Sequence, residues 1–579
     1  RDLHSFPTRR SSDLEPVRYD LTKWLYVQGR FGTDFTSRDN ASSEAYGTAY
    51  KPRGDFNESF QTIREDNYDL FVGGNKTFGD FSVDVLLGGN KMTRKAESKG
   101  GGGNDLVVPF VHSVTNVAAP SFSYAFNQQG VNSVFGSANF SYKNFVFLNA
   151  TARQDRFSTL DPNDNSIVYP SIGASVILSD ALKLPAIISF AKLRGSWAQA
   201  GGGAPGPYEL LLNYGLVGSG HLNGQNANLG QITNGSIPNP TLKPFLTSES
   251  EIGVDIRFLK NRFGIDFAWY NKKTTDEILA TSISSTSGFG STLINIAESS
   301  NKGIELLLTG AIIDNKNLKW EVTVNYAKNT SKVLNLGTNA SGDPIKTLNG
   351  EESRVRRERI AFIVGQPVGM ITGYKHRTDD KGQKMYTPEG YPITTAGYEA
   401  IAEGIHPISA GVSSTLRYKN FNMQFLIDIR KGGHVASGTN WFAYLYGLQQ
   451  ETLNGRDGTL KVSGILDNGT ALNTTVAAGN IDDYWSRYAN VTENVVYDAS
   501  FGKLRQLSIG YTLPTKMLAK TPIESLSVSL VGRNLLLLWS DVPNIDPESA
   551  YTVDRRSQGL EFFALPQTRS FGVNVAVNF

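Results

Sequence analysis

The sequence has no cysteine, almost no net charge and no long hydrophobic run. The missing cysteines exclude disulfide bonds, thiolate zinc sites and cysteine nucleophiles. The 56 Lys and Arg residues are balanced by 54 Asp and Glu residues, so the chain lacks the basic surface that nucleic-acid binding requires and we expect no nucleic-acid partner. The apolar run near 184–191 is far shorter than the roughly 18 residues of a membrane-spanning helix. Any segment that crosses a membrane must therefore be a strand.

The first 14 residues read RDLHSFPTRRSSDL. They are basic and polar, and they contain no apolar core of a secretory signal. Residues 4–14 resemble the translation of a sequencing-adapter oligonucleotide. We therefore interpret residues 1–14 as an artefactual, non-native segment and expect the native fold to occupy residues 15–579.

Apolar and polar residues alternate in many segments, most cleanly at 571–579, where every odd position is apolar. Residues 252–258 and 263–270 repeat this alternation on either side of a turn at Lys260 and Asn261. Because successive side chains of a strand point to opposite faces, these segments predict antiparallel hairpins with one apolar and one polar face. We expect an all-β fold with about 18 such strands.

Short turns alternate along the chain with long polar segments, which include 37–57, 93–131, 201–245 and 431–495. Transmembrane β-barrels have this arrangement, with short turns on one side of the membrane and long loops on the other. The segment 356–376 fits the alternation if it forms two strands separated at Gly365-Gln366-Pro367, and we predict that it does. A soluble antiparallel sandwich also has alternating strands. The alternation of the connections and the number of strands favour the membrane barrel.

Motifs of enzyme chemistry are weak in this sequence. Gly201–Gly206 fits the pattern G-x-G-x-x-G, but Pro205 lies where a phosphate-binding helix would begin. The histidines show no metal-ligand spacing. Asp541, Asp546 and Glu548 are close in sequence, as in a calcium loop or a glycosidase pair, but the intervening prolines favour an ordered loop. We expect no catalytic, cofactor-binding or metal-binding residue, and no enzyme activity.

A dozen motifs, in family order from about residue 20 to the end, resemble the SusC/RagA-like TonB-dependent outer-membrane transporters. They include Lys192–Gln199, Asn239–Pro244, Trp269–Lys273, Asn301–Glu305, Gly365–Gly369, Tyr418–Phe421, Tyr511–Pro514, Asp546–Glu548 and the terminal Phe579.

This resemblance implies a barrel of about 22 strands closed by an N-terminal plug, preceded by a segment that contacts TonB. With about 18 expected strands and no plug-like segment, residues 15–579 resemble the C-terminal part of such a barrel, placed in the outer membrane and in contact with its lipids. The resemblance implies import of glycan or peptide breakdown products, driven through the TonB complex, with a SusD-like surface lipoprotein as a lid. The alternatives are a passive porin or structural barrel and, outside the membrane, a β-rich carbohydrate-binding module.

Eight polar residues alternate with the apolar stripes of their strands, and we expect them to face the lumen of the barrel. Charges of both signs suit neutral, hydroxyl-rich or peptidic cargo such as oligosaccharides or oligopeptides. Alternatively, each is a wall residue solvated by lumen water or in contact with a plug. The eight residues are Asp255, Arg257, Asp266, Lys272, Asn422, Gln424, Asp428 and Arg430.

Four aromatic residues in the long segment 431–495, Trp441, Phe442, Tyr444 and Tyr446, are candidates for contact with sugar rings or with a lipoprotein lid. The alternative is that they pack the loop against itself.

Overall fold

The computed structural model describes residues 2–5, 9–203, 205–216, 230–232, 235–283, 285–339, 342–552 and 557–579. Among these residues, 19 strands form one sheet. The sheet contains β1 (Asp2–Ser5), β2 (Arg9–Asp20), β3 (Leu25–Glu44), β4 (Asp55–Phe78), β5 (Phe81–Asn104), β6 (Ser121–Tyr142), β7 (Val146–Phe157), β8 (Ser166–Ile177), β9 (Ile188–Gly202), β12 (Ser236–Ile237), β13 (Phe245–Phe258), β14 (Phe263–Ser282), β15 (Ser291–Asp314), β16 (Leu318–Asn335), β21 (Ile408–Tyr418), β22 (Phe421–Lys431), β27 (Phe501–Thr512), β28 (Ser525–Ser540) and β30 (Ser570–Asn578). The described N-terminal residues enter this sheet directly as β1 and β2, so no plug domain is found among them.

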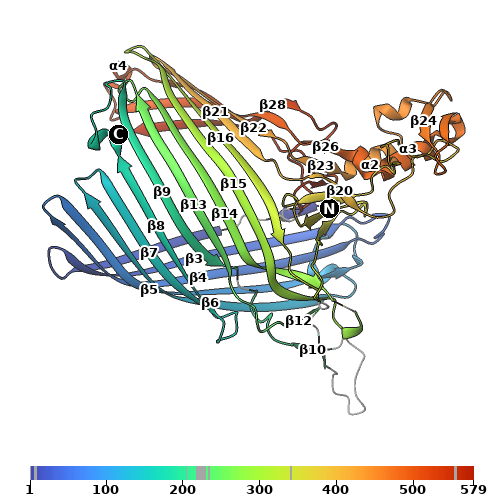
Figure 1. Ribbon diagram of the computed structural model, residues 1–579, viewed down its shortest axis with the longest axis horizontal. Helices are drawn as coiled ribbons and strands as arrows, with labels where there is room; N and C mark the ends of the chain where they lie inside the picture. The colour runs from blue at the N-terminus through green and yellow to red at the C-terminus, as the bar shows by residue number, and fades with distance from the viewer. Residues whose placement is uncertain are drawn as a thin grey trace. The chain divides into compact units, whose positions relative to one another are not determined.

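The chain divides into two compact units. Unit 1 consists of Arg1–Val176, Ser196–Glu249 and Thr274–Ile296. In this unit β2 to β8 pair antiparallel in chain order, and β3, β4, β5 and β6 run side by side (Figure 1). Both β4 and β5 have 24 residues, more than twice the roughly ten that cross a bilayer. These strands therefore extend well beyond a membrane.

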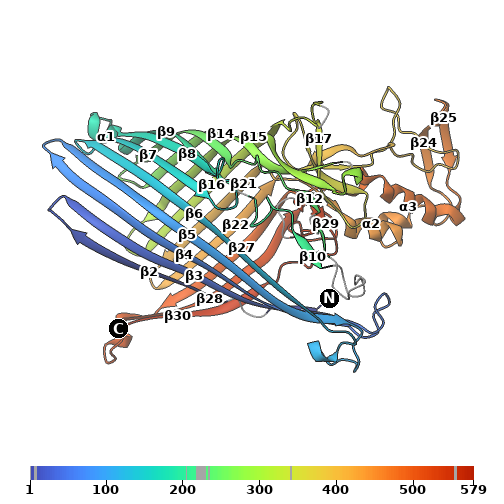
Figure 2. The same ribbon diagram turned by 90° about the horizontal axis from the view of Figure 1, so that it is seen from below.

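Unit 2 consists of Ile177–Gly195, Ser250–Lys273 and Ala297–Phe579. Its strands β15, β16, β21, β22, β27, β28 and β30 pair antiparallel in that order. Figure 2 shows β22, β27 and β28 side by side. One face of these strands carries exposed apolar side chains, such as Leu530 at 65% and Phe571 at 79% exposure. Exposure of this kind is expected for a surface that contacts lipid.

The three long connections of unit 2 fold into smaller elements, which we call the loop subdomain: residues 336–407, 432–500 and 541–569. Its four-stranded sheet contains β17 (Thr347–Glu352), β18 (Glu358–Ile363), β19 (Met370–Gly373) and β20 (Glu399–Glu403), and a three-stranded sheet contains β23 (His434–Ser437), β26 (Val496–Asp498) and β29 (Leu560–Glu561). The hairpin of β24 (Lys461–Ile465) and β25 (Ala471–Thr475) and the helices α2 (Gly438–Leu445) and α3 (Ile481–Asn490) complete it.

A hydrophobic core lies inside the loop subdomain. Its buried members are Tyr391, Tyr444, Val462, Val476, Tyr484, Trp485, Ala489 and Val495. Because these residues come from segments far apart in the sequence, burial of their side chains holds the long connections together. The loops of unit 2 are therefore folded structures with their own interior.

Short elements occupy the other connections. They are α1 (Leu178–Ala181), α4 (Thr515–Leu518), β10 (Tyr214–Leu216), β11 (Gly230–Ile232) and the 3-10 turns at Val114–Asn116 and Ser285–Ser287; three further 3-10 turns, at Gln450–Leu453, Ala478–Asn480 and Thr492–Val495, lie in the loop subdomain. Among the described residues, none of the helices has the length and apolarity needed to cross a membrane.

The prediction for 356–376 was right about the strands and wrong about their place. The chain does form two antiparallel strands there, β18 and β19, separated by the turn at Gly365. They belong to the loop subdomain because Ile360 and Ile371 are buried in a second core of it, with Ala436 and Leu560, and the strands have only 6 and 4 residues. The whole of 336–407 is thus one long connection, and short and long connections still alternate.

Two long segments that were predicted as loops are partly strand. In 37–57, β3 continues to Glu44 and β4 begins at Asp55, and in 93–131, β5 continues to Asn104 and β6 begins at Ser121. Beyond the membrane a strand needs only its backbone hydrogen bonds, not an apolar face. Polar composition therefore concealed these strand ends.

Candidate functional site

Four of the predicted lumen residues share one face of β22. In the ladder, Asp428 lies opposite Gly411 of β21 and Lys503 of β27, and Gln424 lies opposite Thr415 and Ser508. Asn422 and Arg430 continue this face, and the alternate positions Met423, Phe425, Ile427 and Ile429 form the opposite, apolar face. We call the side with Asp428 the polar face.

The other four predicted residues lie on β13 and β14. Arg257 and Asp255 form an ion pair at 3.2 Å on β13. On β14, Asp266 binds Arg194 at 2.9 Å, and Arg194 also reaches Glu251 at 3.3 Å. A Cβ atom at Gly253 would lie 2.5 Å from the guanidinium carbon of Arg194, so glycine leaves the space that this contact needs. Lys272 keeps the alternation of Asp266 and therefore lies on the same face of β14.

The Arg194–Asp266 pair borders a cavity of about 390 Å³, which Glu305 and Asn325 also line. The structure thus groups the eight predicted positions on polar faces of the sheet. That they enclose a water-filled lumen stays a prediction.

Lys503 and Arg505 were missed by the sequence analysis. In the pairing of β27 with β22 the register shifts between Leu504 and Gln506, so Arg505 is an extra residue there, and the pairing of β27 with β28 is irregular at the same place. A bulge changes the direction of the strand's side chains. Leu507 lies opposite Phe425, on the apolar face. Strict alternation would place Lys503 and Arg505 on that apolar face too. In the structure both instead bind acidic residues of the polar side.

Lys503 and Arg505 hold the last long connection of unit 2. The amine of Lys503, which is only 6% exposed, donates to Asp546 Oδ1 and to Glu548 Oε2, both at 2.6 Å. Arg505 binds both oxygens of Glu548 and donates to Asp428 Oδ2 at 2.7 Å. We call these five residues the ionic cluster.

The electrostatics of the ionic cluster favour charged carboxylates. Burial opposes ionisation of Asp546 and Glu548, but the hydrogen bonds from Lys503 to both, and from Arg505 to Glu548, outweigh it and lower the pKa of each carboxyl. The prolines between these carboxylates predict an ordered loop here rather than a calcium or glycosidase site. The ion pairs confirm that these carboxylates anchor the loop.

The four aromatic candidates of 431–495 divide into two pairs. Tyr444 is 5% exposed, lies in the core and donates its hydroxyl to Glu451, and Trp441 packs against the same core. These two rings pack the loop against itself. Tyr446 is 67% exposed and stacks on Phe442 with ring centroids 5.8 Å apart.

Phe442, Tyr446, Phe562 and Phe563 form a cluster of rings, which we call the aromatic patch. Phe442 contacts Phe562 and Phe563 at centroid distances of 5.8 and 5.4 Å. The exposed side chains of Leu448 and Leu565 belong to the same chain segments as these rings. Contact of this patch with a ligand or lid stays a prediction.

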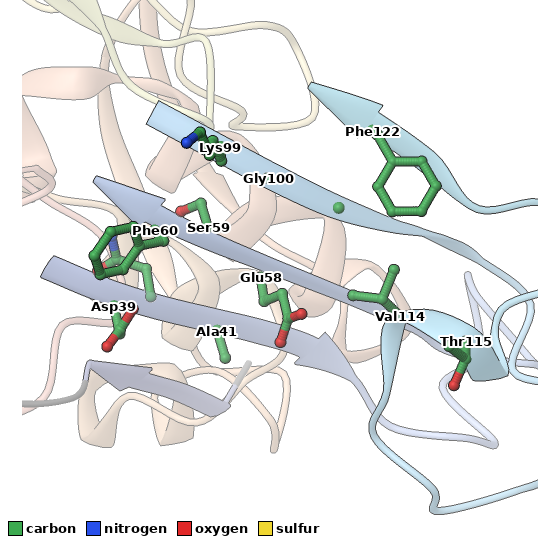
Figure 3. A pocket seen from close by; sticks show the side chains of 12 residues that line it. Asp39, Ala41, Glu58, Ser59, Phe60, Lys99, Gly100, Val114, Thr115 and Phe122 are labelled. Carbon is green, nitrogen blue, oxygen red and sulfur yellow. The ribbon is translucent and has the colours of Figure 1, made fainter. Parts of the chain in front are cut away.

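A cavity of about 730 Å³ lies in unit 1 among β3, β4, β5 and β6. Figure 3 shows Asp39, Glu58, Phe60 and Phe122 around it. Counting along β4, Glu58 and Phe60 share a face with the exposed apolar residue Leu70, not with the polar Asp69. This cavity therefore lies on the apolar side of the sheet, opposite the polar side that we expect to line a conduit.

The remaining motifs give no site among the residues that the structure describes. The described part of Gly201–Gly206 is the end of β9 and the start of a loop, without a helix. In the described ranges, no group of three or more His, Asp or Glu side chains is placed to hold a metal ion.

A large antiparallel sheet with an exposed apolar face and a charged polar face is typical of a membrane β-barrel. The family described as TonB dependent receptor-like, beta-barrel, matches residues 5–535. The chain therefore belongs to the TonB-dependent receptor family, which comprises outer-membrane transporters and not enzymes. The resemblance inferred from the sequence motifs is confirmed.

Relatives and solved structures agree with this family. The chain is 26% identical to TonB-dependent receptor P3 of Formosa agariphila over 539 residues, covering 87% of this chain and 51% of that protein. It is 26% identical to TonB-dependent receptor P26 of the same organism, covering 78% of this chain and 46% of that protein. The chain thus spans about half the length of the curated relatives it matches.

Solved structures share the fold. The structure of the RagAB peptide transporter has a TM-score of 0.75 and 17% sequence identity, and the match covers 99% of this chain and 62% of that one. The copper transporter OprC has a TM-score of 0.52 at 12% identity, covering 99% of this chain and 66% of the other. This shared fold confirms the expected β-barrel.

Proposed function

We propose that this chain is the C-terminal barrel part of a TonB-dependent transporter that imports glycan or peptide breakdown products across the outer membrane. The two-faced sheet carries this proposal: the polar face has Arg194, Asp266 and Asp428, and the opposite face exposes apolar residues such as Leu530. A wall with charges of both signs suits neutral or zwitterionic molecules better than one kind of ion. The fold shared with the RagAB peptide transporter supports a peptidic cargo by analogy.

The proposed lid is a SusD-like surface lipoprotein that contacts the loop subdomain. The aromatic patch supports this contact because exposed aromatic clusters are frequent at protein interfaces. Phe442 and Phe563 are fixed by ring contacts with Phe562, so the surface is prearranged for a partner.

The proposed energy source is the TonB complex, contacted by the part of the whole protein that precedes this barrel. The match to about half the length of the relatives supports such a division. We therefore test the function with the whole protein encoded by the gene.

The experiment measures uptake of labelled oligopeptides and oligosaccharides into cells that produce the whole protein, with and without a functional TonB. We expect uptake only in cells with TonB. Equal uptake in both strains would contradict an energised importer and would favour the passive porin. Recovery of the protein as a monodisperse monomer in detergent-free supernatant would contradict both and would favour a soluble carbohydrate-binding module.

A further inference from the structure

A cavity of about 370 Å³ lies in unit 2 where four segments of the chain meet, 404–406, 430–435, 499–501 and 547–560. His406, Arg430 and His434 line it, together with Glu548 and Ser549. Arg430 also belongs to the polar face of β22, so the cavity adjoins the proposed conduit. Its volume is within the range of about 300–1,000 Å³ that is typical of small-molecule sites.

Two polar atoms of residues that line this cavity have no hydrogen-bond partner in the described part of the protein. They are Nδ1 of His434 and Oγ of Ser549, and both are buried. A buried polar atom without a partner costs about 1–3 kcal/mol, so most such atoms in native proteins are paired. Both atoms belong to residues that line this cavity, so a polar group bound there is a candidate partner for them.

The charges around the cavity favour an anionic ligand group. Glu548 is a lining carboxylate, but Lys503 and Arg505 bind both of its oxygens, which compensates its charge. Arg430 is half-exposed and lies 3.5 Å from Asp428 Oδ1, a long contact. The other oxygen of Asp428 already accepts two hydrogen bonds from Arg505. The guanidinium of Arg430 is thus the cation with the weakest pairing here.

The ionic cluster positions the hydroxyl of Ser549. Asp546 and Glu548 are held by Lys503, and the backbone N–H of Ser549 donates to the carbonyl oxygen of Asp546 at 2.9 Å. The walls of the cavity are apolar at Val435, Phe501 and Leu560. An apolar surrounding strengthens a charged hydrogen bond next to it.

We propose that this cavity binds a carboxylate group of the imported molecule, through Arg430, Ser549 and His434. This inference rests on the proposed import function and adds a chemical class to its cargo. A carboxylate accepts several hydrogen bonds in one plane, which suits the fork of donors on an arginine. The group is either the C-terminus of an oligopeptide or the acid group of a uronic-acid sugar.

The test uses the whole protein, purified in detergent, and two matched pairs of probes. One pair is an oligopeptide with a free C-terminal carboxylate and the same peptide as its amide. The other is an oligosaccharide ending in a uronic acid and the same chain ending in the neutral sugar. We expect the carboxylate member of one pair to bind about tenfold more tightly, a typical value for a charged hydrogen bond. The pair that shows this preference identifies the source of the carboxylate.

The substitutions Arg430→Met and Ser549→Ala should each remove most of that preference and leave binding of the amide or neutral probe unchanged. The matched control is Arg417→Met: this arginine lies near the opposite end of the β21–β22 hairpin, beside Asn422, and it does not line the cavity. Ser549→Ala removes one hydroxyl and keeps the test valid if Arg430→Met fails to fold.

Equal affinity for both members of both pairs, or equal losses for both members in Arg430→Met, would overturn the inference. TonB-dependent uptake measured on the same probes separates the two proposals. If uptake requires TonB and shows no preference for a carboxylate, the import function holds and only this subsite is refuted.

Discussion

Substitution of Glu358 by glutamine should change how the stability of the loop subdomain depends on pH. Glu358 is fully buried at 0% exposure at the start of β18. Its Oε1 accepts a hydrogen bond from Ser353 Oγ at 2.6 Å, while its Oε2 is buried with no partner among the described residues. Burial raises the pKa of Glu358 from 4.5 to about 7, against the opposing effects of Ser353 and Arg357, and the nearby carboxylates of Glu352 and Glu561 raise it further.

The magnitude follows from the difference between the folded and unfolded states. Between pH 4.5 and about 7 the unfolded chain loses this proton while the folded chain keeps it. Stability therefore falls as the pH rises through this window and levels off above it. Each pKa unit corresponds to about 1.4 kcal/mol, so Glu358 should cost the folded loop subdomain about 3 kcal/mol at pH 8 relative to pH 4.

The assay is hydrogen exchange of segment 347–373 in the whole protein at pH 5 and pH 8, corrected for the intrinsic exchange rates. The wild type should be less protected at pH 8, and Glu358→Gln should remove most of this difference. Glu351→Gln, an exposed position in the same segment, is the control and should keep it. The reasoning would be refuted if Glu358→Gln showed the same pH dependence as the wild type.

Three further predictions concern the loop anchor, the membrane face and the aromatic residues. Lys503→Met should destabilise the 541–569 segment by about 3–5 kcal/mol, because Asp546 and Glu548 lose a buried partner. Limited proteolysis should then cut that segment faster. Unchanged resistance to the protease would count against the ionic cluster as an anchor. The folded-state pKa values of Asp546 and Glu548 lie below their usual values of 3.8 and 4.5. The anchoring should therefore be complete above pH 4.5 and be lost as the pH falls through the lowered pKa values. At such low pH the wild-type 541–569 segment should become sensitive to protease. Ile265→Arg or Val575→Arg should cost about 2–4 kcal/mol in lipid and Asp266→Asn little, and similar urea midpoints for all three would contradict the assigned faces. Tyr444→Ala should destabilise the loop subdomain by about 3–5 kcal/mol and Tyr446→Ala by far less, as measured by hydrogen exchange of α3; equal effects would contradict their different burial.

Much of the large sheet could be predicted from the sequence because a strand with two different faces shows a period of two. The predicted segments 252–258 and 263–270 lie in β13 and β14, and 571–579 corresponds to β30. The prediction weakened where strands leave the membrane, because polar strand ends such as those of β4 and β5 lack the apolar stripe. It also misplaced β18 and β19, since a short apolar strand has the same composition in a loop core as in a barrel wall.

The site was predictable only where the alternation is regular. Asp428 and Gln424 follow the period of β22, and the register places them as expected on one face. Lys503 and Arg505 could not be assigned, because a bulge displaces the alternation and depends on pairing with two neighbouring strands. The partners of Lys503 come from residues 43 and 45 positions further along the chain, which no local pattern reveals.

The most direct test of the barrel assignment is the environment of consecutive residues of β14. Spin labels are attached one at a time at positions 263–269 of the whole protein in outer-membrane lipid, and their collisions with oxygen and with a water-soluble nickel complex are measured. We predict that labels at Phe263, Ile265, Phe267 and Trp269 meet mainly oxygen, and that those at Gly264, Asp266 and Ala268 meet mainly the nickel complex. Absence of this alternation, or shielding of the odd positions from both reagents, would contradict a sheet with one face in lipid and the other in water.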